Sequence, residues 1–194
     1  MSEKASAATG TRERLLAAAE RLLLTERYED VSVRGICAAA GANAAAVHYH
    51  FGSKEALVSA LIEDRLGPLW AGRLAVVSAE RESVGAVVDA VIEPFLALAD
   101  DPVGRLHLRL LAQLMHGRQP MIWNHRWFRM ESWVALLPEL SEAESRRRWM
   151  LAFDLIIMRF GAASATEHGM SAQSVDTLRD FVVAGLAAPV KEKK

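Results

Sequence analysis

Cysteine is almost absent from this chain, because Cys37 is its single cysteine. One cysteine cannot form an intrachain disulfide, and it cannot supply the several thiolates of a cysteine-based zinc site. This usage is typical of a reducing cytoplasm. The N-terminal stretch also lacks the apolar segment of a secretory signal, and no run of about 18 uncharged apolar residues is present to span a membrane. We therefore expect a cytoplasmic protein without a membrane partner.

An excess of charge of one sign is missing as well, since 23 Lys and Arg residues stand against 24 Asp and Glu residues. The net charge of −1 gives no global sign of a nucleic-acid or membrane partner, so any charge that faces DNA must be local. The first 54 residues are also nearly neutral, with seven basic and six acidic residues. Few phosphate contacts predict a shallow salt dependence for one subunit, and dimerisation would double those contacts.

The composition that remains is that of a globular protein, 52% hydrophobic and 24% charged. Apolar residues recur mostly at helical spacing, which predicts an all-α fold. We expect a disordered leader at residues 1–10, a three-helix unit at 11–66 and a helical bundle at 67–194. Thr11 is expected to cap the first helix, and Gly67-Pro68 to kink or close the fourth. Bundle helices are expected at residues 83–99, 103–116, 121–137, 142–165 and 172–188.

Residues 32–51 describe two helices that are too short to stand alone, joined by a tight turn. Ser32 and Asn43 are suited to cap them, and Gly41 gives the backbone freedom that a helix end needs. The second helix, expected at residues 44–50, opens on three alanines. Small side chains let a helix N-terminus enter the major groove of DNA. Such a helix pair can also serve packing alone, but this combination favours a DNA-binding helix-turn-helix.

The N-terminal unit resembles the TetR family of transcriptional regulators over residues 11–66. The resemblance is carried by the Ser32 cap, the turn Ala40-Gly41-Ala42-Asn43, and the run Val47-His48-Tyr49-His50-Phe51-Gly52-Ser53-Lys54-Glu55-Ala56-Leu57. The rest of the chain is also similar to the branch of the family related to regulators of fatty-acid metabolism. That second likeness rests on Leu137-Pro138-Glu139-Leu140-Ser141 and the arginine-rich helix start after it.

The resemblance implies which residues of this chain face DNA. These are Arg34, Asn43, Ala44, Ala45, His48, Tyr49, His50 and Lys54. His48 stands where the family often has a tyrosine that touches phosphate, and the charge of a histidine there depends on pH. The alanines offer methyl contacts but no hydrogen bonds to bases, so direct readout would depend on Arg34 and Tyr49, with DNA shape supplying the rest.

The bundle contains aromatic and methionine side chains that can line an apolar effector pocket with a few polar anchors. The expected ligand-binding residues are Trp123, Trp127, His107, Gln113 and Met130. Each of them can equally be ordinary core. Three histidines, His107, His116 and His125, are nine residues apart and do not share one helix face at close range. We therefore expect no metal site and no cofactor.

The run Arg146-Arg147-Arg148 is interpreted as a solvated or salt-bridged face, and alternatively as a site for an anionic head group. An enzyme is not expected, because no Gly-rich phosphate loop, nucleophile elbow or metal-ligand pair is present. Another alternative is a DNA-binding protein without an effector, which a fully packed bundle would favour.

The last two helices carry apolar faces that a chain of this size cannot fully bury, which predicts a four-helix homodimer interface. Residues 67–194 would then be an effector-binding and dimerisation domain. The sequence as a whole predicts a homodimeric repressor that is released from a palindromic DNA operator by a small apolar or amphipathic effector.

Overall fold

The computed structural model describes residues 2–117, 123–165 and 169–190, and within these ranges all regular secondary structure is helical. The all-α prediction is therefore confirmed. The chain divides into two compact units, residues 1–64 and 65–194. The sequence placed this boundary after residue 66.

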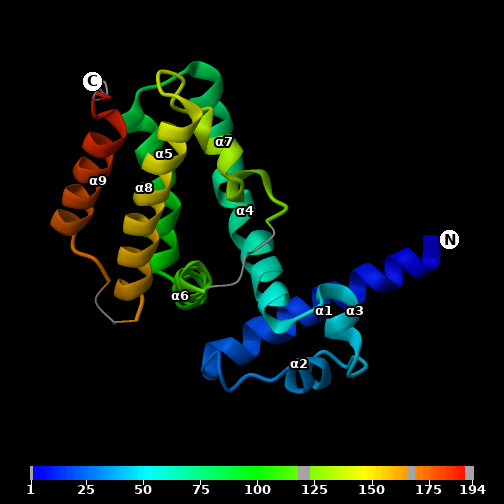
Figure 1. Ribbon diagram of the computed structural model, residues 1–194. Coiled ribbons are helices and arrows are strands. Elements are labelled where there is room, and N and C mark those ends of the chain that lie inside the picture. The colour runs from blue at the N-terminus through cyan, green and yellow to red at the C-terminus, as the bar shows by residue number, and fades with distance from the viewer. Residues whose placement is uncertain (1, 118–122, 166–168, 191–194) are drawn as a thin grey trace. The chain divides into compact units, whose positions relative to one another are not determined.

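The N-terminal unit contains α1 (Ser2–Thr25), α2 (Val33–Ala39), α3 (Ala46–Phe51) and the first turns of α4 (Lys54–Glu80) (Figure 1). Its core is built from one apolar face of each helix, because none of the short helices could bury enough surface alone. The fully buried side chains include Leu15, Leu16, Ile36, Val47, Leu57 and Leu61.

The leader prediction is wrong, since α1 already begins at Ser2. Residues 2–8 are Ser, Glu, Lys and Ala, and most of these residue types favour a helix, so they extend the helix that follows. Thr11 consequently lies inside α1 and is not its cap. Its hydroxyl oxygen accepts a hydrogen bond from Arg14 Nη2 at 3.1 Å.

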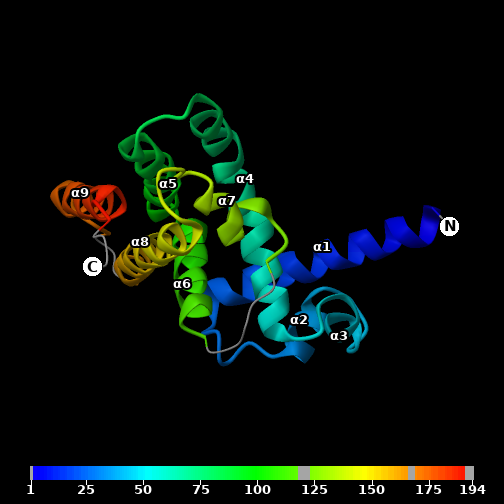
Figure 2. The same cartoon turned by 45° about the horizontal axis from the view of Figure 1, so that its top comes forward.

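The C-terminal unit is a bundle of the remainder of α4 with α5 (Val84–Ala99), α6 (Pro102–His116), the 3-10 turn η1 (Arg126–Phe128), α7 (Met130–Val134), α8 (Glu142–Ala163) and α9 (Ala172–Ala187). α6 packs on both α5 and α8, and α9 packs on the same two helices. α7 packs on α8. Figures 1 and 2 show α8 beside α9 from two directions.

Four bundle helices begin directly after a serine or an aspartate whose side chain caps the helix. The side chains of Ser83, Asp101, Ser141 and Ser171 each accept a hydrogen bond from the backbone N–H three residues later. The expected helix at 121–137 is wrong, because its described part has no helix at residues 123–125 and then forms only the short elements η1 and α7. Gly67-Pro68 does not close α4, which runs on to Glu80.

An ion pair joins α9 to α5 in the bundle. Arg179 Nε donates to Asp89 Oδ1 at 2.5 Å, and Arg179 Nη2 donates to Asp89 Oδ2 at 2.9 Å. These hydrogen bonds hold the pKa of the Asp89 carboxyl below its usual value. Both side chains are partly exposed, so solvent and salt screen the pair.

We expect Asp89→Asn to lower the melting temperature at neutral pH and to reduce the loss of stability in acid. Because the folded-state pKa of Asp89 is depressed, its contribution is complete above the unfolded value, near 3.8, and is lost as the pH falls through the folded value. Thermal melts of the wild type and the variant from pH 7 to pH 3 test this. Curves that stay parallel over this range would contradict it.

Candidate nucleic-acid interface and apolar cavity

The turn between α2 and α3 is fixed by side-chain caps and one left-handed residue. Ser32 Oγ accepts from the N–H of Gly35 at 3.0 Å and so begins α2. Gly41 has a φ of +58°, a conformation that a side chain would strain. Asn43 Oδ1 then accepts from the N–H of Ala45 at 2.9 Å. The prediction that Asn43 caps α3 is wrong, because α3 starts at Ala46 with Ala45 as its N-cap, and the Asn43 side chain closes the turn before the helix instead.

α3 presents a small and mostly polar outer face. Ala44, Ala45 and His48 are exposed, and Tyr49 is 82% exposed. Val47 is fully buried and anchors the helix to the core of the unit. The exposed Tyr49 ring, an apolar body with a polar tip, has no place in the core, which is the expected condition of a side chain that meets a partner.

His50 lies half-buried beside Tyr49, and their rings meet edge to face with centroids 5.0 Å apart. His48 Nδ1 lies 2.9 Å from the carbonyl oxygen of Gly52. A carbonyl can only accept, so Nδ1 carries the hydrogen and a neutral His48 leaves Nε2 as an acceptor. His48 can therefore donate to a phosphate only in its protonated form.

Lys54 has intramolecular partners that the sequence did not reveal. Its Nζ donates to the carbonyl oxygens of Tyr28 at 2.8 Å and Val31 at 3.0 Å. Nζ also lies 4.2 Å from the centroid of the Tyr28 ring. Burial and the neighbouring carboxylate of Glu55 raise the pKa of Tyr28 to about 12. Lys54 thus ties the start of α4 to the preceding loop.

Four other basic side chains of the N-terminal unit have partners within the protein. Arg14 and Arg21 of α1 donate to the carbonyl oxygens of Ala40 and Ala39 at the end of α2. Arg12 lies 5.4 Å from the centroid of the Phe51 ring, and Arg27 pairs with Glu29 at 3.7 Å.

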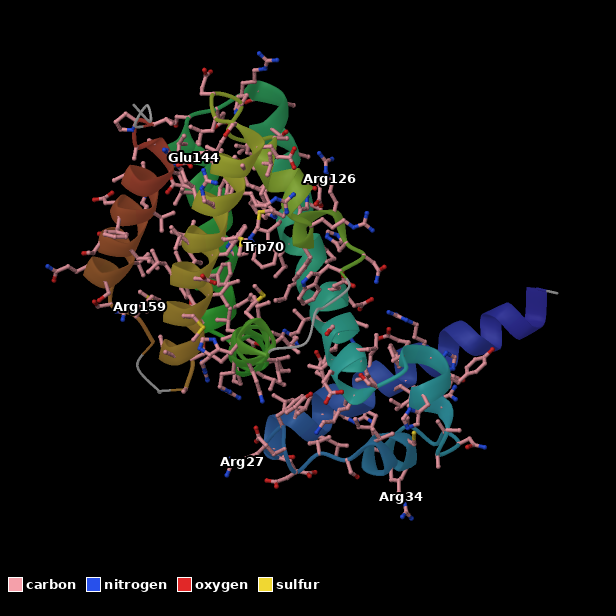
Figure 3. All side chains as sticks on the ribbon, viewed as in Figure 1. Arg27, Arg34, Trp70, Arg126, Glu144 and Arg159 are labelled. Carbon is pink, nitrogen blue, oxygen red and sulfur yellow. The ribbon has the colours of Figure 1, made fainter. Side chains whose placement is uncertain are left out.

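Arg34 differs from all of these. Within residues 10–54, where side chains are described, its guanidinium is the one basic group without an intramolecular partner. Arg34 is exposed in the first turn of α2, and Figure 3 shows its side chain pointing away from the ribbon. The cation that remains available to a phosphate or a base is therefore on the helix that precedes α3.

An apolar cavity of about 110 Å³ lies inside the C-terminal unit. Its wall comes from α4, α5, α6, α8 and the segment at 123–133, and Figure 3 labels Trp70, the α4 contribution. The lining residues are Trp70, Val91, Phe95, Leu111, Met115, Trp123, Trp127, Phe128, Met130, Trp133, Phe153 and Ile157.

Of the five expected ligand-binding residues, Trp123, Trp127 and Met130 line this cavity and the two polar ones do not. Gln113 is exposed, because it lies two residues from Leu111 and so on the far side of α6. His107 is buried one turn before Leu111, beyond the end of the cavity. The expected polar anchors are thus absent from the described wall.

Gly67 has a packing role, although the sequence predicts a kink or a helix end at this position. A Cβ atom added to Gly67 would lie 2.7 Å from His125 Cδ2, so a side chain there would collide with the imidazole. The missing side chain lets the segment that carries Trp123, Trp127 and Phe128 lie against α4. A glycine beside a proline signals a kink, and nothing in the linear pattern separates that signal from a close approach.

The arginine run at the start of α8 is paired. Arg146 bridges Glu131 and Glu142 at 3.4 Å each, while Arg147 and Arg148 share Glu144. Arg148 also donates to the carbonyl oxygens of Leu186 and Ala188 and so caps the end of α9. These contacts favour the salt-bridge interpretation over a site for an anionic head group.

Among the described residues, no three or more His, Cys, Asp and Glu side chains are grouped so that they could hold a metal ion. Nor does any helix in the described ranges have the length and apolar character needed to cross a membrane.

Comparisons with known proteins agree with this geometry. Residues 15–61 match the family model of bacterial regulatory proteins of the tetR family. The fold resembles native NalD, the secondary repressor of the MexAB-OprM multidrug efflux pump in Pseudomonas aeruginosa, with 18% identity, a TM-score of 0.58, and 90% of this chain and 96% of NalD covered. No curated protein matches the sequence.

A second solved structure, described as the molecular basis for control of antibiotic production by bacterial hormones, is also similar. It has 18% identity, a TM-score of 0.55, and the same coverage of 90% and 96%. At this identity the two structures establish the fold, and the family model establishes the helix-turn-helix. Residues 15–61 therefore form a domain that matches the tetR family of bacterial regulatory proteins.

Proposed function

We propose that this protein is a homodimeric repressor that binds a palindromic DNA operator and releases it when a small molecule enters the bundle. The observation that carries the proposal is the exposed face of α3, where Tyr49 is 82% exposed beside a run of small residues. Unpartnered Arg34 lies on the preceding helix. An aromatic tip, methyl groups and one available cation suit a helix placed in a major groove.

The cavity supports a ligand-responsive regulator over a DNA-binding protein without an effector, because it leaves unfilled apolar space inside the bundle. NalD, with which the chain shares its fold, is described as a repressor, which supports repression over activation. An enzymatic function has no such support. Effector and operator would be coupled reciprocally, so operator DNA should weaken effector binding by the same factor as the effector weakens operator binding.

The homodimer would form through the exposed faces of α8 and α9, the two helices that the sequence predicts for the interface. Trp149, Ile156 and Phe160 of α8 are buried within the protomer and are not available to a partner. The exposed apolar side chains of the pair are instead Met150, Leu151, Leu155 and Phe181. Leu151 is 65% exposed and Phe181 is 67% exposed, values that favour burial against a second copy.

The central experiment selects operator duplexes from a random pool with the wild-type protein and measures the mass of the protein in solution. We expect palindromic sequences and a mass of twice 21.3 kDa. Leu151→Glu places a charge in the proposed interface and is expected to give a monomer that binds the selected duplex at least about tenfold more weakly. The matched control is Val76→Glu, at an exposed apolar position of α4 outside the proposed interface.

Two outcomes would contradict the proposal. If the wild-type protein enriches no sequence, the proposal of a specific operator is wrong. If the Leu151→Glu variant remains dimeric, the proposed α8–α9 interface is wrong, while the DNA-binding assignment stays in place.

A further inference from the structure

The wall of the bundle cavity is unusually rich in aromatic rings. Seven of its twelve lining residues are tryptophan or phenylalanine, and the other five are Val91, Leu111, Met115, Met130 and Ile157. None of these twelve is ionisable. A charged ligand in such a place would lose its hydration without gaining a counter-charge from the described wall, which is energetically costly.

Two of the four indole N–H groups of the wall donate hydrogen bonds within the protein. Trp70 Nε1 donates to the carbonyl oxygen of Val91 at 3.0 Å, and Trp133 Nε1 donates to that of Trp127 at 2.9 Å. These bonds hold two indole rings in fixed orientations and leave their N–H groups unavailable to a ligand. The wall therefore offers mostly ring faces, ring edges and methylene groups, which favour an aromatic ligand through edge-to-face and stacked contacts.

The volume sets the size of the ligand. An apolar cavity of about 150 Å³ holds one benzene molecule, and this cavity measures about 110 Å³. A long acyl chain is much larger than either. Met115 is 45% exposed and Trp123 is half-buried, so two flexible or accessible wall residues connect the cavity to solvent and can adjust to a single ring.

We infer that the cavity binds an uncharged compound with a single aromatic ring and rejects charged compounds of the same shape. This inference rests on the proposed function, in which the bundle holds the effector, and it narrows the effector class from apolar or amphipathic to neutral and aromatic. A cavity of this kind does not favour the likeness to the branch related to regulators of fatty-acid metabolism that the sequence analysis describes, if that branch binds long acyl chains.

Four of the five tryptophans line the cavity, so bromobenzene, which quenches indole fluorescence on contact, is a direct probe. We expect saturable quenching of the DNA-free protein by bromobenzene. Quenching by 4-bromobenzoate and 4-bromobenzylammonium, which carry opposite charges, should be at least tenfold weaker. Bromocyclohexane should bind several-fold more weakly than bromobenzene if the rings of the wall favour an aromatic partner. Decanoate should not compete.

Two variants locate the binding. Leu111→Phe adds volume at the wall and should weaken bromobenzene binding at least tenfold, with circular dichroism to verify folding. Met115→Arg places a cation at the exposed edge, where its stem can lie on the wall and its head in water. That variant should gain affinity for 4-bromobenzoate. Val76→Ala removes an exposed apolar side chain of α4 that does not line the cavity and should leave bromobenzene binding unchanged.

The possible results separate this inference from the proposed function. Equal or tighter binding of 4-bromobenzoate by the wild type, competition by decanoate, or no binding of bromobenzene would overturn the inference and leave repression untouched. Tight bromobenzene binding that has no effect on a selected operator duplex would instead contradict the effector role and leave the ligand class in place.

Discussion

Replacing Ala45 with glutamate is expected to abolish operator binding, with an affinity loss of at least about 100-fold, without destabilising the protein. Ala45 is exposed and forms the N-cap of α3. A carboxylate at this point would face the phosphates and base edges of the groove, and a dimer would carry two of them. The same carboxylate interacts favourably with the positive end of the α3 dipole, so the melting temperature should stay equal or rise.

The matched control makes the same chemical change at another helix start. Ala172 is the exposed first residue of α9, and Ala172→Glu should leave binding of the selected duplex unchanged. Ala45→Ser keeps the side chain small and should bind within a few-fold of the wild type. Fluorescence anisotropy with a labelled duplex measures all three. If Ala45→Glu binds as the wild type does, α3 is not the helix that reads DNA.

The sequence was sufficient for the helix-turn-helix because local rules determine that region. The cap at Ser32, the left-handed glycine at 41 and the Asn43 turn act within a few residues of each other, so their roles follow from spacing alone. The start of α3 was misplaced by two residues, since Asn43 closes a turn before the helix begins. Caps mark the neighbourhood of a helix start more reliably than its first residue.

Long-range contacts explain what sequence reasoning missed in the same unit. Lys54 was expected at a phosphate, yet its ammonium contacts carbonyls 23 and 26 residues earlier in the chain. Likewise, Arg14 and Arg21 are two of the seven basic residues among the first 54, and in the structure they cap the end of α2. A net charge counts these arginines and Arg34 in the same way. Only the folded structure shows that the guanidinium of Arg34 has no intramolecular partner among the described residues.

The presence of an apolar cavity could be predicted from the sequence, but the full set of residues that line it could not. The cluster of tryptophan and methionine at 123–133 indicated an apolar pocket, and all four of its members, Trp123, Trp127, Met130 and Trp133, line the cavity. Trp70, Val91 and Phe95 come from α4 and α5, and their part depends on how helices distant in sequence pack together. The expected polar residues, His107 and Gln113, do not line the cavity, since the stripe of α6 that faces it carries Leu111 and Met115.

Gly161→Ala is expected to lower stability by about 2 kcal/mol, because α8 crosses α6 at this glycine without room for a methyl group. A Cβ atom at Gly161 would lie 2.4 Å from Ala112 Cβ and 3.4 Å from the carbonyl oxygen of Leu108. The gain in helix propensity from Gly to Ala, about 1 kcal/mol, offsets part of the clash. For a chain of this length, the melting temperature should fall by roughly 4–8 °C.

Gly72→Ala tests the same replacement where there is room. Gly72 is exposed inside α4, and an added Cβ would meet nothing within 4 Å, so this variant should gain about 0.5–1 kcal/mol of stability.

Ala112→Gly combined with Gly161→Ala moves the methyl group from one helix to the other and should recover most of the loss, giving a coupling energy of about 2 kcal/mol. Additive single effects at fixed protein concentration would show that the two helices are not in contact there. Since α6 and α8 also supply Leu111, Met115, Phe153 and Ile157 to the cavity, the single variant should change bromobenzene binding as well, and the double variant should restore it.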